Sequence, residues 1–178
     1  MKTKETKMKT TIDFTRFATV VFLTLMCGAI FFAAVSFVKA NPDSSLSKET
    51  KQELARARQA TARYHNINNA IADGYFDINV FFPNMGYHYL KRDILDAEFD
   101  PAKPELLVYA DFGNGHPRLV ALEYAVPLAL SQNPPEGFTG DDDHWHRNET
   151  FGLWTLHAWI WYPNPDGMFA AYNPRVPE

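Results

Sequence analysis

The sequence predicts an α+β domain in which a strongly curved, mostly antiparallel sheet or small β-barrel is covered by one long N-terminal helix. Three observations predict this class. Apolar residues recur at three- and four-residue steps through residues 48–73, and most segments after Gly74 alternate with period two. Asn114-Gly115 also separates two alternating runs, which is the typical sequence of a tight hairpin.

The first 40 residues are predicted to be a signal peptide or membrane anchor. Five basic residues precede the 22-residue uncharged run Phe17–Val38. Val38-Lys39-Ala40 is typical of a cleavage site and favours a signal peptide, whereas the length of the run suits an uncleaved transmembrane helix. Both alternatives place the remainder in the periplasm or outside the cell, with membrane contact only through residues 17–38.

Residues 41–47 are predicted to be a polar linker and 48–178 a single domain. The only cysteine is Cys27, so this domain has no disulfide. Six of the 17 basic residues but only two of the 21 acidic ones lie in residues 1–40. The domain is therefore acidic, which argues against nucleic acid as a partner and leaves the oligomeric state open.

The elements of the domain follow from local patterns. A helix is expected from Lys48 to Asp73, with Ser47 as its N-cap and Gly74 as its C-terminal stop. Strands are expected at Tyr75–Phe82, Met85–Leu90, Leu106–Phe112, Arg118–Val126 and Phe151–Tyr162.

Glu123 is predicted to be the only charged residue on one face of the central hairpin. With Asn114-Gly115 as a two-residue loop, Asp111 faces Arg118 and Leu106 faces Glu123. A buried carboxylate is costly without a partner. Either this end of the face therefore meets solvent, or a cationic group lies opposite.

His88 and His157 each occupy the middle of a predicted strand, on a mainly apolar face. If the sheet curls, these two residues converge with Glu123. Two neutral imidazoles and a carboxylate suit Zn²⁺, Fe²⁺ or Mn²⁺ and leave coordination positions open for a ligand. The alternative is that each histidine is a hydrogen-bonded core residue.

A second candidate metal segment is His144-Trp145-His146. In an extended chain both imidazoles project to one side, and the Gly140–Gly152 segment is similar to the cupin metal motif with shorter gaps. The alternatives are a solvated loop, or one of these histidines completing the site on the strands. Trp159 is the candidate to line a ligand pocket beside His157.

Five motifs resemble those of a family of uncharacterised exported prokaryotic proteins: GxHY, PExLVY, LVxxEY, LHxWxW and NPxGxF, followed by a further NP. The match spans roughly Ala60 to Val176. Ala110 stands where the family often has an acidic residue. The resemblance implies a shared unit around His88, Glu123 and His157 and no particular reaction.

The sequence thus predicts an exported protein that binds a metal ion or small ligand through a His/Glu pocket. One alternative is a cupin-like metal-dependent enzyme of unknown substrate, in which Glu123 or an activated water acts as base. The other is a structural or interaction module with a buried polar network. Serine and cysteine nucleophiles are improbable, because the sequence has no G-x-S-x-G motif and no cysteine after Cys27.

Overall fold

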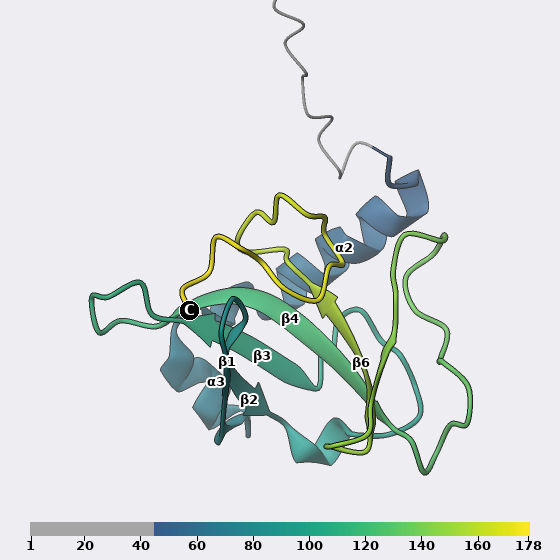
Figure 1. Ribbon diagram of the computed structural model, residues 1–178, viewed down its shortest axis with the longest axis horizontal. Coiled ribbons are helices and arrows are strands. Elements are labelled where there is room, and N and C mark those ends of the chain that lie inside the picture. The colour runs from purple at the N-terminus through teal and green to yellow at the C-terminus, as the bar shows by residue number, and fades with distance from the viewer. Residues whose placement is uncertain (1–44) are drawn as a thin grey trace, which may run out of the picture. The chain divides into compact units, whose positions relative to one another are not determined.

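The computed structural model describes residues 45–178 (Figure 1). The predicted signal peptide or anchor at residues 1–40 lies outside this part of the chain. Among the helices of residues 45–178, none has the length and apolar character needed to cross a bilayer.

The helical region is broken, so the prediction of one long helix from Lys48 to Asp73 is wrong. It consists of α2 (Lys48–Thr61), the 3-10 turn η2 (Ala62–His65) and α3 (Ile67–Ala72). Ser47 caps α2 as predicted, since its hydroxyl accepts from Thr50 N at 3.0 Å. Asn66 starts α3 in the same way by accepting from Asn68 N, and this local bond competes with a continuous helix.

The domain also begins earlier than expected. Leu46 lies in the predicted linker at residues 41–47, yet it is buried in the main hydrophobic core. Because the neighbouring residues in the sequence are polar, their pattern carried no indication that Leu46 is buried.

The curved antiparallel sheet is confirmed, and its strand order is β1-β2-β3-β4-β6-β5. The elements are β1 (Phe76–Phe82), β2 (Gly86–Leu90), the 3-10 turn η3 (Arg92–Ile94), β3 (Leu106–Ala110), β4 (Arg118–Pro127), β5 (His146–Asn148) and β6 (Leu153–Ala158). Figure 1 shows the long β4 curving through the sheet, with α2 behind it. β5 was not expected, and β6 is shorter than predicted at both ends.

The β3–β4 hairpin follows the predicted register only in part. Leu106 pairs with Glu123 as expected, but an irregularity after Val108 shifts the rest of the pairing. The predicted Asp111–Arg118 pair is therefore wrong. Asp111 instead caps the loop, because its Oδ1 accepts from the backbone N–H groups of residues 113, 114 and 115.

Two hydrophobic clusters lie on opposite faces of the sheet. The larger joins the helices to alternate residues of β4, including Leu122 and Tyr124. The smaller contains Val108, Ala121 and Trp159, together with Val176 from the C-terminal segment. Glu123 alternates with Leu122 and Tyr124, so it lies on the face of the smaller cluster.

The C-terminal segment is tied to the turn between β1 and β2. Asn84 N donates to Pro177 O at 3.0 Å, and Asn173 N donates to Asn84 O at 2.9 Å. Asn173 is completely buried, and its side-chain amide donates to the carbonyl oxygens of Tyr162 and Pro163. Asn173, the asparagine of the last NP motif, therefore has a structural role in this region.

Candidate metal centre

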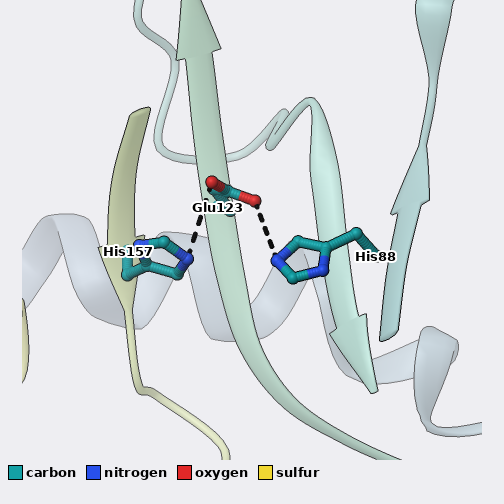
Figure 2. A group of neighbouring side chains, drawn as sticks. All are labelled: His88, Glu123 and His157. Carbon is teal, nitrogen blue, oxygen red and sulfur yellow. Dashed lines mark ion pairs between the residues drawn. The ribbon is translucent and has the colours of Figure 1, made fainter. Parts of the chain in front are cut away.

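His88, Glu123 and His157 come from three strands and project from one face of the sheet. β4 pairs with β6 so that Glu123 lies directly opposite His157. His88 in β2 lies opposite Val108 of β3, one strand further from β4. Figure 2 shows the three side chains on the same side of the strands, with the helix behind. The three residues therefore converge as predicted. The curl of the sheet brings His88 on β2 close to Glu123 on β4, although β3 lies between these strands.

The carboxylate of Glu123 lies between the two imidazoles. His88 Nε2 is 3.4 Å from Oε2 of Glu123, and His157 Nε2 is 3.5 Å from Oε1 (Figure 2). The potential ligand atoms of the three residues all lie within 4.8 Å of one another. The exposed fractions are 3% for each histidine and 6% for Glu123, so the group is enclosed. It could hold a metal ion.

An irregularity in β1 fixes the ring of His88. Asp77 pairs with Tyr89 and Phe81 with Tyr87, so residues 78–80 all lie opposite His88. His88 Nδ1 is 3.2 Å from the carbonyl oxygen of Val80. A carbonyl only accepts hydrogen bonds, so Nδ1 carries a proton. In the neutral ring, Nε2 then presents a lone pair towards Glu123.

His157 has no hydrogen-bond partner among residues 45–178 at either ring nitrogen, although both nitrogens are buried. Burial lowers the pKa of His157; the charge of Glu123 acts in the opposite direction, and His88 and His146 add to the lowering. Burial therefore favours the neutral form of the ring. A neutral imidazole is the form that binds a metal.

Aromatic rings surround the group. Phe82 packs edge-on to His88, with ring centroids 5.8 Å apart, and also contacts Phe151 at 6.3 Å. Trp159 stacks on His157 at 6.2 Å and 14°, and its Nε1 donates to Ala170 O. Trp159 is 1% exposed, so it supports the imidazole from within the core. Its predicted role in lining a ligand pocket stays a prediction.

His144 and His146 are exposed and lie outside the group of three. His146 begins β5 and pairs with Thr155 of β6, two residues before His157. The structure therefore places one of the two histidines near the enclosed group, although neither belongs to it. Of two surface hollows, of about 940 and 440 Å³, neither is lined by His88, Glu123 or His157, and His144 lines the smaller one.

Glu105 is a buried carboxyl group that the sequence analysis missed. It is 3% exposed, and its Oε2 accepts from Ala125 N at 2.9 Å. Burial raises the pKa of Glu105 to about 8, while the hydrogen bond from Ala125 acts in the opposite direction. The signal in the sequence was its position directly before the apolar run Leu106–Ala110.

The chain was compared with protein-family models, curated proteins and solved structures, and none of the three comparisons found a match.

Proposed function

We propose that this domain binds one divalent metal ion of the Zn²⁺, Fe²⁺ or Mn²⁺ class through His88, Glu123 and His157. The observation that carries the proposal is the convergence of two buried imidazoles on one buried carboxylate, with all three ligand atoms within 4.8 Å. These are ligand types that such ions accept.

The spacing of the donor atoms supports a metal ion at the centre. Tetrahedral ligands about 2.0–2.1 Å from zinc stand about 3.3–3.4 Å from each other. The two nitrogen-to-oxygen distances, 3.4 Å to Oε2 and 3.5 Å to Oε1 of Glu123, lie close to that value, although each is measured to a different oxygen. Direct charge-assisted hydrogen bonds between imidazole and carboxylate would be shorter, at about 2.7–2.9 Å.

The hydrogen bonding of the group also supports the proposal. Val80 O holds the Nδ1 proton of His88, a backbone contact that often orients metal-binding histidines. The carboxylate of Glu123 has ionic contacts only to the two imidazoles within residues 45–178. A buried network that only stabilised the fold would satisfy the nitrogens of His157 with hydrogen bonds, yet neither nitrogen has a hydrogen-bond partner among residues 45–178.

Metal analysis of the purified protein tests the proposal. We expect about one equivalent of metal per chain by mass spectrometry after purification without chelators. Glu123→Gln preserves shape and removes the charge, so it should lower the metal content strongly. His88→Ala and His157→Ala should do the same.

His116→Ala is the matched control, because His116 is exposed in the β3–β4 loop. It should retain the full metal content. Substoichiometric metal in the unmodified protein, with no uptake of added Zn²⁺, Fe²⁺ or Mn²⁺, would contradict the proposal. The same analysis identifies the preferred ion.

A further inference from the structure

The proposed metal centre would carry a net positive charge and unfilled coordination positions. One divalent ion, one carboxylate and two neutral imidazoles sum to a single positive charge. Three protein ligands leave at least one position for a ligand from solution. The direction of that position follows from the residues on either side of the three ligands.

One side of the group is closed by the core. Val108 lies opposite both His88 and Ala121, and both Val108 and Ala121 are fully buried. Trp159 stacks on His157. These three residues belong to the smaller hydrophobic cluster, so this side offers neither space nor polar groups to an incoming ligand.

The other side is lined by a small residue and a polar residue, Ala125 and Thr155, which are both buried. Ala125 and Thr155 pair with each other across β4 and β6. Each is two residues from Glu123 or His157, so both project from the same face. His146 pairs with Thr155 on β5, at the edge of the sheet, and its side chain is exposed.

We infer that the open position of this metal centre faces Thr155 and His146 and binds a small anion. Ala125 has only a methyl side chain, and the hydroxyl of Thr155 can donate a hydrogen bond to the anion. The imidazole of His146 at the edge offers a further N–H donor. The inference rests on the proposed metal site.

Azide binding to the Co²⁺-loaded protein tests the inference. Co²⁺ in a site with nitrogen and oxygen ligands absorbs visible light, and coordination of an anion changes this spectrum. We expect azide to change the spectrum in a saturable manner. Thr155→Val, which keeps the shape and removes the hydroxyl, should weaken azide binding about tenfold.

His146→Gln should weaken azide binding by a smaller factor, about threefold, because water at the exposed edge of the sheet competes with its side chain for the anion. The matched controls are His144→Gln and Thr150→Val, which alter exposed residues outside this row of the sheet. Both controls should bind azide as the unmodified protein does.

Two results would overturn the inference while the proposed metal site stands. One is stoichiometric Co²⁺ with a spectrum that azide does not change. The other is azide binding that neither Thr155→Val nor His146→Gln weakens. Failure of the unmodified protein to bind Co²⁺, or any ion of the proposed class, would instead overturn the metal site and the inference together.

Discussion

The buried carboxyl of Glu105 should make the stability of the domain fall as the pH rises. Its pKa moves from an ordinary 4.5 to about 8 in the folded protein. The folded state therefore holds a proton that the unfolded state has released between these values. The stabilising contribution is complete below pH 4.5 and is lost as the pH rises to about 8.

The size of this effect follows from the two pKa values. A tenfold change in a protonation equilibrium is worth about 1.4 kcal/mol, so the interval from 4.5 to about 8 sets a ceiling of about 5 kcal/mol. Water penetration and local relaxation reduce such penalties. We therefore expect a loss of about 2–4 kcal/mol between pH 5 and pH 8.5.

Glu105→Gln is the perturbation that isolates the effect. Glutamine resembles the protonated acid, and its carbonyl can still accept from Ala125 N. The assay is urea unfolding of the metal-free protein, with chelator present, across this pH range. The variant and the unmodified protein should agree near pH 5, and the variant should be about 2–4 kcal/mol more stable at pH 8.5.

The contributions of all other titrating groups cancel when the free energy of unfolding of the unmodified protein is subtracted from that of Glu105→Gln. Glu98→Gln serves as the control, since Glu98 is exposed, and its stability should follow the unmodified protein at each pH. If the Glu105→Gln and unmodified curves run parallel, the raised pKa and the reasoning from burial are refuted.

Three further predictions concern the metal centre. Gly86→Ala should destabilise the fold by at least about 2 kcal/mol, measured by urea unfolding, and should lower metal affinity, measured by metal titration. The φ of Gly86 is +119°, and an added Cβ would lie 2.4 Å from Tyr109 O. This clash would displace the strand that carries His88. Phe151→Ala should accelerate metal removal by a chelator severalfold in stopped-flow measurements, because the exposed ring of Phe151 packs on Phe82, which in turn packs on His88. Acidification should release the metal, because protons compete with it for the imidazoles. The lowered pKa of His157 should place its protonation below the pH at which an ordinary histidine protonates. NMR titration of the metal-free protein measures this pKa.

Each of these predictions has a contrary outcome. Gly115→Ala also alters a glycine with positive φ, but its added Cβ would meet nothing within 4 Å. Equal losses of metal affinity in Gly86→Ala and Gly115→Ala would show that the contact of the added Cβ with Tyr109 O is not the cause. Phe76→Ala alters another exposed aromatic residue and should leave metal release unchanged. An ordinary or raised pKa at His157 would show that burial does not govern its charge.

The alternation of side chains explains why the candidate site was predictable. Period-two patterning assigned Glu123 and His157 to apolar faces without knowledge of their partners. The pairing of Leu106 with Glu123 then followed from hairpin geometry, because the irregularity of the β3–β4 register lies beyond this pair, after Val108.

Features that depend on distant contacts were missed or wrongly predicted. The shift after Val108 removes the predicted Asp111–Arg118 pair, and sequence alternation carries no sign of it. β5 has only three residues, too few for a periodic signal. The contact between Val80 O and His88 depends on a backbone carbonyl, which every residue possesses, so side-chain identity could not reveal it.

The irregularity in β1 also has a consequence for the behaviour of the protein in solution. β1 is an outer strand of the sheet, and an outer strand with regular backbone groups invites pairing with another molecule. Asn79 has a φ of +56°, so residues 78–80 interrupt the row of free donors and acceptors. The same distortion that orients the imidazole of His88 should therefore disfavour the pairing of β1 with a strand of another molecule.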